Sequence, residues 1–202
     1  MYKLEDYHID FISEGHEYYV NGVRKPCLSD QIYDLIQIND FDKIPPHILA
    51  NAALTGTRIH KAIELDLTVG VNFNDLHDSI KGLFTSYLLY KEENKLEPEL
   101  VEKKLYCPSK DYCLTLDFKG KSLGRRILVD WKKGGIYKTY RAQIGGQLRG
   151  LMDYFDEPFE YCACVQLFKN GKIAKEHIYD QKEALLDFDS INRVYNLKHK
   201  KG

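Results

Sequence analysis

The stretch LDFKGKSLGRRILVDWK runs from Leu116 to Lys132 and contains two segments with the composition of β-strands. Asp117 closes the first segment, and Asp130-Trp131-Lys132 closes the second. Residues two positions apart on a strand point to the same face, so Asp130 and Lys132 are predicted to lie side by side. Asp117 is expected to bring a second carboxylate to the same place. The stretch therefore predicts two carboxylates and one ammonium at the ends of two neighbouring strands.

The segments before this stretch predict a β-ribbon followed by helices. Residues 8–26 alternate and turn at Ser13-Glu14-Gly15 and at Asn21-Gly22, and Asn-Gly between strand-like runs is a strong hairpin signal. Ser29 is placed to cap a helix through Gln37, and Asn39-Asp40 with Pro45-Pro46 predicts a loop and a new helix start. Gly56 lies inside the next helical pattern, where glycine costs about 1 kcal/mol relative to alanine, so we expect a break there or a close approach by another backbone.

The remaining segments predict an α/β domain with a mixed central sheet flanked by helices. The sequence shows breaks at Gly134-Gly135 and at Asn170-Gly171, and residues 96–99 are expected to be a linker. The predicted helices cover residues 46–67, 78–93, 140–154 and 182–196, and the predicted strands cover residues 100–106, 112–118, 126–131, 161–168 and 172–179.

Composition is that of an ordinary globular protein, with 44% hydrophobic and 29% charged residues among 202. The chain contains no run of 18 apolar residues, and its first ten residues lack the layout of a signal peptide, so we expect a cytoplasmic protein that does not enter a membrane. Five cysteines are an odd number, and Cys162 and Cys164 lie in an apolar run. Reduced, buried thiols are the expected state.

Charge is distributed unevenly along the chain. Residues 1–100 hold 9 basic and 17 acidic residues, whereas residues 101–202 hold 20 basic and 13 acidic residues. Within residues 103–149 there are 12 basic residues and three acidic ones, and two of those three are Asp117 and Asp130. A solvated surface is one interpretation of this basic belt. Its position around the two carboxylates instead favours a polyanionic ligand brought to a metal site.

The residue types in the central stretch suit a divalent cation. Mg²⁺ prefers carboxylate and carbonyl oxygens, which Asp117, Asp130 and the carbonyl of Trp131 can supply, and Mn²⁺ also accepts an imidazole. Upstream, His60 and Glu64 lie one turn apart on a predicted helix face. Lys132 can polarise an attacking water and offset charge that develops on a phosphate. Asp-x-Lys alone is a weak signal, and each of these residues also has a structural interpretation as a cap or a surface ion pair.

The order of several elements resembles the PD-(D/E)XK nuclease superfamily, in particular its RecB-like branch of phage-type and mitochondrial-type exonucleases. Gly56-Thr57-Arg58-Ile59-His60 through Glu64 resembles the helical motif, and Glu102, Asp117, Asp130-Trp131-Lys132 and Gln143 follow in the expected order. The similarity covers residues 56–155. It implies a restriction-endonuclease-like core, a metal held by His60, Asp117, Asp130 and the carbonyl of Trp131, and catalytic roles for Lys132, Asp117, Asp130, Glu102 and Gln143.

The order of the predicted elements also gives a division of the chain, and the basic belt gives a set of nucleic-acid contacts. We expect one nuclease domain, with a hairpin and helix over residues 1–45, the core over 46–180, and a C-terminal helix and basic tail over 181–202. The ribbon and the helices between residues 28 and 95 are expected to build one wall of the cleft, or an arch over it. The residues predicted to bind nucleic acid are Lys119, Arg125, Arg126, Lys133, Lys138, Tyr140 and Arg141.

Three positions depart from the pattern of the superfamily. Leu114 stands where a glycine is common before the catalytic aspartate, which puts the backbone turn there in question. Gln147 stands in place of an aromatic residue, whose role we expect Tyr140 or Tyr137 to take. Lys133 replaces a threonine or serine. Some relatives carry an iron-sulfur cluster with three downstream cysteines, but only Cys162 and Cys164 follow here, so no cluster is expected.

The leading hypothesis is a Mg²⁺- or Mn²⁺-dependent deoxyribonuclease, more specifically an exonuclease acting on DNA ends or single strands in recombination, repair, replication or phage DNA processing. A phage-encoded enzyme in the host cytoplasm, with a recombination or replication protein as partner, fits this hypothesis. Two alternatives remain open at this point. One is a module that binds DNA or protein with weak or no hydrolysis, and the other is a structure-specific endonuclease. The oligomeric state is also open.

Overall fold

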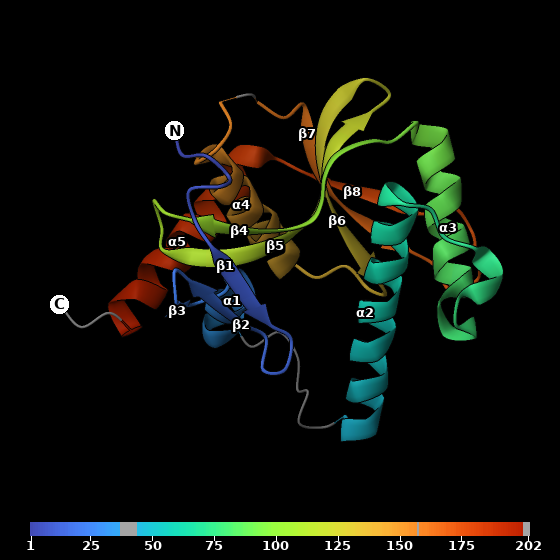
Figure 1. Ribbon diagram of the computed structural model, residues 1–202, viewed down its shortest axis with the longest axis horizontal. Coiled ribbons are helices and arrows are strands. Elements are labelled where there is room, and N and C mark those ends of the chain that lie inside the picture. Colours follow the sequence, from blue (N-terminus) through green and yellow to red (C-terminus); the bar gives the residue numbers. More distant parts are fainter. Residues whose placement is uncertain (37–43, 157, 200–202) are drawn as a thin grey trace.

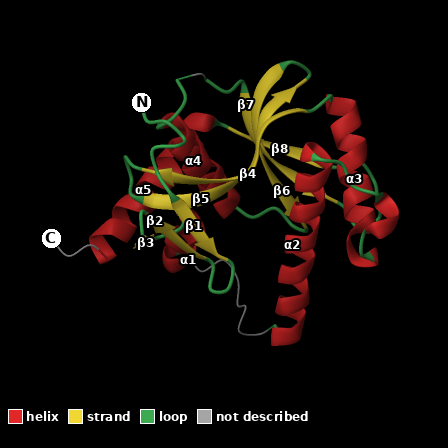
Figure 2. Ribbon diagram, viewed as in Figure 1, coloured by secondary structure: helices red, strands yellow, loops and turns green. Residues whose placement is uncertain are grey.

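The computed structural model describes residues 1–36, 44–156 and 158–199, and its centre is a five-stranded mixed sheet (Figures 1 and 2). The strands are ordered β4-β5-β6-β7-β8. Only the β6–β7 pair is parallel, and the other neighbouring pairs are antiparallel. Their bounds are β4 (Glu97–Cys107), β5 (Tyr112–Ser122), β6 (Arg125–Lys133), β7 (Tyr161–Leu167) and β8 (Lys175–Tyr179).

A separate three-stranded antiparallel ribbon precedes this sheet and consists of β1 (Ile9–Ile12), β2 (Glu17–Val20) and β3 (Val23–Lys25). Asn21 and Gly22 connect β2 to β3 with positive φ angles of 49° and 79°, as a two-residue hairpin turn of this hand requires. An isolated backbone β-bridge pairs Cys27 with Cys113 and attaches the end of the ribbon to β5, and both cysteines are free thiols. The predicted hairpin is therefore confirmed, and its position on the sheet is fixed.

Helices cover both faces of the central sheet, which confirms the predicted fold class. One face packs against α2 (Pro46–Thr68) and α3 (Asp78–Asn94), with the 3₁₀ turn η2 (Phe73–Asp75) between them. The other face packs against α1 (Leu28–Leu35), α4 (Thr139–Met152) and α5 (Gln181–His199). Two large clusters of buried side chains lie between these helices and the strands.

Several predicted boundaries were wrong. Cys27 rather than Ser29 caps α1, because its Sγ accepts a hydrogen bond from the backbone N–H of Asp30 at 3.4 Å. The helix ends at Leu35, and the predicted loop at residues 39–40 lies outside the described residues. The predicted linker at 96–99 is mostly strand, since Glu97 already pairs with Lys121. Helix α5 extends to His199, into the predicted tail.

Helix α2 is continuous through Gly56, so the predicted break was wrong. A methyl group at this position would lie 3.1 Å from Cε of Lys133. The neighbour that approaches the glycine is therefore the flexible side chain of Lys133, and not another backbone.

Strands β4 and β5 change direction together halfway along their length (Figure 1). Leu116 packs with the cluster under α4, whereas Phe118 packs with the cluster under α2 and α3. Side chains two positions apart normally share a face, so the alternation reverses at Asp117. Glu102, which lies opposite Asp117 in the register, has a positive φ of 45°. The reversal turns both carboxylates toward α2.

Over the described residues, none of the helices combines the length and the apolar composition that crossing a bilayer requires.

Candidate metal centre

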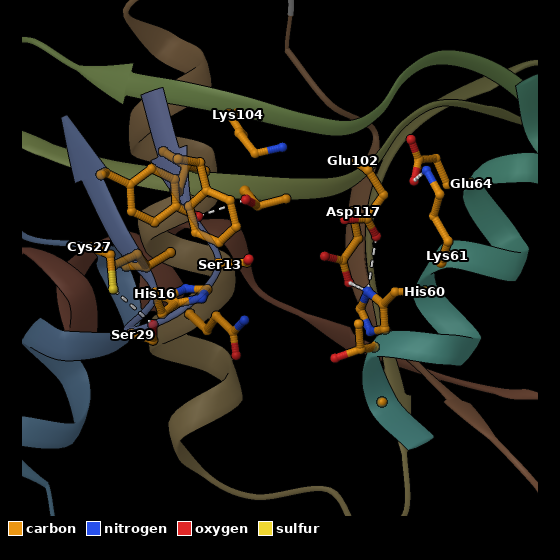
Figure 3. Close-up of a pocket in the computed structure, with 18 residues that line it drawn as sticks. Ser13, His16, Cys27, Ser29, His60, Lys61, Glu64, Glu102, Lys104 and Asp117 are labelled. Carbon is orange, nitrogen blue, oxygen red and sulfur yellow. Dashed lines mark hydrogen bonds and ion pairs between the residues drawn. The ribbon is translucent and has the colours of Figure 1, made fainter. Parts of the chain in front are cut away.

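Three side chains from separate elements converge at this change of direction. His60 projects from α2, Glu102 from β4 and Asp117 from β5, and one ligand atom of each lies within 4.8 Å of the others (Figure 3). His60 Nδ1 lies 3.0 Å from Oε1 of Glu102 and 3.6 Å from Oδ2 of Asp117. One imidazole and two carboxylates form a donor set that suits Mn²⁺, and also suits Mg²⁺ through the carboxylates.

The strand register explains why the two carboxylates meet. Val101 pairs with Phe118 and Lys103 pairs with Leu116, so Glu102 and Asp117 lie directly opposite each other. Like charges at directly opposed positions destabilise a sheet unless a cation neutralises them. In addition, a non-glycine residue with positive φ costs about 1–3 kcal/mol and is concentrated at functional sites. Both costs fall on the pair that faces His60, which supports a cation-binding role.

Asp117 lies at a fork in the sheet. Pairing between β5 and β6 runs from Ser122 and Arg125 to Phe118 and Val129 and then stops. Beyond this point the backbone N–H of Trp131 donates to Oδ2 of Asp117 at 2.9 Å. The predicted role of Trp131 was a carbonyl ligand, but the contact it makes in this structure comes through its N–H. This bond orients the carboxylate, while the indole ring packs in the core against Tyr87 and Tyr90.

Asp130 and Lys132 form a second cluster beside the first. Their predicted common face is confirmed, because Lys132 Nζ lies 2.5 Å from Oδ2 of Asp130. Gln143 on α4 joins the two residues by accepting from Lys132 at 3.0 Å and donating to Oδ1 of Asp130 at 2.9 Å. Gln147, one turn later, donates to the same Oδ1 at 2.9 Å. Asp130 is only 1% exposed, so protein donors hold it completely.

The positions that depart from the superfamily pattern have clear surroundings. Leu114 lies inside β5 and pairs with Leu105, so the backbone before Asp117 is strand here and not the expected turn. The glutamine at 147 reaches Asp130 by a hydrogen bond instead of stacking. Tyr140 supplies the aromatic contact, since Lys132 Nζ lies 4.4 Å from the centre of its ring. Tyr140, predicted to contact nucleic acid, therefore already packs on the lysine of the site.

Burial and neighbouring charges shift the pKa values of His60, Asp117 and Lys132. Burial lowers the pKa of His60, but the carboxylates of Asp117 and Glu102 outweigh burial and raise it to about 9. Burial raises the pKa of Asp117, even though His60 lies beside it. The pKa of Lys132 is raised, because Asp130 outweighs the effect of burial on the ammonium. Because the pKa values of His60 and Asp117 are raised, these two groups hold protons that a cation would displace on binding.

A cleft of about 530 Å³ opens over the His60, Glu102 and Asp117 cluster (Figure 3). Helix α2 and the N-terminal ribbon form opposite walls of this cleft, whereas they were expected to build one wall, or an arch, together. Gln143 lines the cleft and is hydrogen-bonded to both Lys132 and Asp130. Glu64 also lines it but pairs with Lys61 at 2.7 Å, which fits its structural interpretation.

The basic belt of the sequence does not form one track beside the cleft. Lys119 is 7% exposed and pairs with Glu99, and its ammonium lies over the ring of Phe155. Arg125 and Arg126 lie at the far end of β6, seven and six residues before Lys132, or roughly 20–23 Å along the strand. Arg141 pairs with two carboxylates of α5, Glu183 and Asp187. Of the predicted contacts, Lys133 at the end of β6 and the exposed Lys138 before α4 lie nearest to Lys132 in the chain.

Sequence reasoning missed several residues of the cleft. Lys104 and Thr115 face each other across β4 and β5, two positions from Glu102 and Asp117, so the i, i+2 rule could have found them. His16 and Ser13 enter from the ribbon, and their arrival depends on how the ribbon docks. No local pattern near residue 16 indicates that contact.

Neither a family model nor a curated protein sequence matches this chain. Among solved structures, the crystal structure of LHK-Exo in complex with dAMP is similar, with 10% sequence identity and a TM-score of 0.38. The similarity covers 86% of this chain and 87% of that one.

Proposed function

We propose that this protein is a divalent-metal-dependent nuclease that hydrolyses phosphodiester bonds in DNA, at ends or in single strands. The observation that carries the proposal is the convergence of His60, Glu102 and Asp117 at the fork between β5 and β6. This donor set fits a divalent cation, since two opposed carboxylates otherwise lack a neutralising charge beyond the imidazole. When bound, such a cation supplies Lewis-acid stabilisation of phosphate oxygens.

The protein's own residues have separate roles in this proposal. His60, Glu102 and Asp117 would hold the cation, and the N–H of Trp131 orients Asp117. Lys132 carries the positive charge that stabilises a phosphate as negative charge develops on its oxygens. Gln143 and Tyr140 position Lys132, because one accepts from its ammonium and the other packs beneath it. Asp130 keeps the ammonium charged and oriented.

The test is degradation of end-labelled linear DNA in Mg²⁺, Mn²⁺ or EDTA. Cleavage is expected with either metal and not in EDTA, and Asp117→Asn or Lys132→Ala is expected to reduce the rate by at least about 100-fold. The exposed residues Asp156 and Lys182 provide matched controls, as Asp156→Asn and Lys182→Ala. Cleavage that survives Asp117→Asn would refute the proposal. Circular DNA should resist an exonuclease, so its loss would point to an endonuclease.

One observation favours a second candidate, a module that binds DNA without cutting it. Both oxygens of Asp130 already accept from protein donors, so Asp130 lies outside the three-residue donor set. Thermal unfolding in Mn²⁺ separates the candidates, because a ligand of the folded state raises the melting temperature. The nuclease proposal expects a rise that Glu102→Gln reduces. DNA binding with neither a rise nor cleavage would favour the binding module.

A further inference from the structure

The wall opposite the metal centre consists of aromatic rings and one lysine. Phe11 lies 4.8 Å from Tyr18 and 5.1 Å from the ring of His16, measured between ring centres. Lys104 Nζ lies 5.2 Å from the centre of the Phe11 ring. Figure 3 shows His16 and Ser13 on the ribbon side of the cleft, facing His60, Glu102 and Asp117 across open space, with Lys104 between the two sides.

The three rings differ in burial, so one of them supports the wall and the other two form its accessible surface. Tyr18 is 1% exposed and donates to or accepts from Oγ1 of Thr115 at 2.7 Å, so it fixes the ribbon to the sheet. His16 is exposed and Phe11 is half-buried, and both line the cleft. The cleft therefore has a rigidly held aromatic surface whose outer rings remain accessible.

Lys104 differs from three other lysines near the sheet in having no partner carboxylate within the described part of the chain. Lys25, Lys91 and Lys119 each form an ion pair with a carboxylate. Among the residues that the structure describes, no carboxylate lies within ion-pair distance of Lys104, whose ammonium lies over the Phe11 ring. Two positions along β4 separate it from Glu102, which is about 6.5 Å. A negatively charged group beside the metal centre would thus meet an available ammonium.

We propose that Phe11, His16 and Lys104 bind one unpaired nucleotide of the substrate strand, with its base against the rings and a neighbouring phosphate at Lys104. The proposal rests on the nuclease function and specifies its substrate as a strand with an unpaired base beside the reacting phosphate. The cleft volume of about 530 Å³ is within the range of roughly 300–1,000 Å³ for small-ligand sites. A base in a duplex has its faces covered by neighbours, whereas an unpaired base can stack on an aromatic side chain.

The test uses binding of a fluorescently labelled single-stranded thymidine oligonucleotide in EDTA, where metal-dependent cleavage cannot interfere. A series of oligonucleotides with one abasic site moved along the strand locates the stacked base. For the unmodified protein, one abasic position should weaken binding by about 5- to 150-fold, the range expected for a stacked base. Phe11→Leu and His16→Asn should weaken binding of the intact strand and abolish this discrimination.

The substitutions are chosen to preserve the fold. Leucine keeps an apolar side chain against Tyr18, and asparagine tolerates the positive φ of 53° at His16. Lys104→Ala should weaken binding and reduce the slope of log K against log salt by about 0.7, the value for one phosphate contact on a single strand. Ile12 and Lys103 are the exposed neighbours on the opposite strand faces, so Ile12→Ala and Lys103→Ala are matched controls.

Equal affinity of the unmodified protein for intact and abasic strands would overturn the proposal, as would discrimination that persists in both ring variants. The two proposals fail in different ways. Base-dependent binding without cleavage in any metal would refute the nuclease function and leave the binding wall in place. Metal-dependent cleavage together with unchanged oligonucleotide binding by Phe11→Leu would refute the binding wall and leave the nuclease function in place.

Discussion

The buried pair of Asp130 and Lys132 can be tested by a double-mutant cycle on the metal-free protein. Asp130 is 1% exposed and the side chain of Lys132 is 16% exposed, with 2.5 Å between Oδ2 and Nζ. Removing one partner of a buried pair costs about 3–5 kcal/mol, because the other charge stays buried without its counterion. Lys132→Met and Asp130→Asn should each lower the free energy of unfolding by about that amount.

The double variant removes both charges, so it should lose much less than the sum of the single losses. If the single losses add to about 6–10 kcal/mol, we expect the double variant to be at least about 2 kcal/mol more stable than additivity predicts. Urea denaturation in EDTA measures these values, with the slope m checked for each variant. The exposed pair of Asp78 and Lys81 is the control, with a coupling of at most about 0.5 kcal/mol. Additive losses at Asp130 and Lys132 would refute this account of the site.

Two further predictions concern the framework around the site. Gly145→Ala should lower the urea midpoint, because a methyl group there would lie 1.9 Å from the carbonyl oxygen of Ala184, and overpacking of about 1–3 kcal/mol outweighs a helix gain of about 1 kcal/mol. Gly56→Ala, which meets only the flexible end of Lys133, should be neutral or stabilising by urea denaturation. The native protein should resist a thiol-specific reagent at pH 8, and unfolding should expose five reactive thiols, because burial raises every cysteine pKa and disfavours the reactive thiolate. Burial raises the pKa of Cys27 to about 11, raises the pKa values of Cys107, Cys113 and Cys162 to about 12, and raises the pKa of Cys164 well above its ordinary value.

Relations along a single element could be predicted from the sequence. Asp130 and Lys132 are two positions apart on one strand, and the strand period alone places them together. The Asn21-Gly22 turn was predictable for the same reason, since only local φ angles decide it. The order of helices and strands likewise follows from hydrophobic patterning, which fixed the fold class before any contact between distant segments was known.

Relations between elements could not be predicted in this way. The number of basic residues near Asp117 suggested a single basic track for nucleic acid. Composition alone does not show that Lys119 pairs with Glu99, or that Arg141 pairs with Asp187. The boundaries of β4 were also missed, because its extension back to Glu97 depends on pairing with β5. The approach of His16 to the cleft depends on the bond between Tyr18 and Thr115, which joins segments 97 residues apart.

The charges of the site imply that cation binding and nucleic-acid binding are coupled. Glu102 and Asp117 bring two carboxylates together beside His60, and Asp130 is close enough to raise the pKa of Asp117 while it pairs with Lys132. A divalent cation held by His60, Glu102 and Asp117 would present two positive charges to a phosphodiester entering the cleft, so the cation and the nucleic acid should favour each other's binding. By thermodynamic linkage, the factor by which Mn²⁺ raises the affinity for an oligonucleotide must equal the factor by which the oligonucleotide raises the affinity for Mn²⁺. Stacking of a base on the Phe11 ring involves no such charge, so the contribution of Phe11 should be the same with and without the cation.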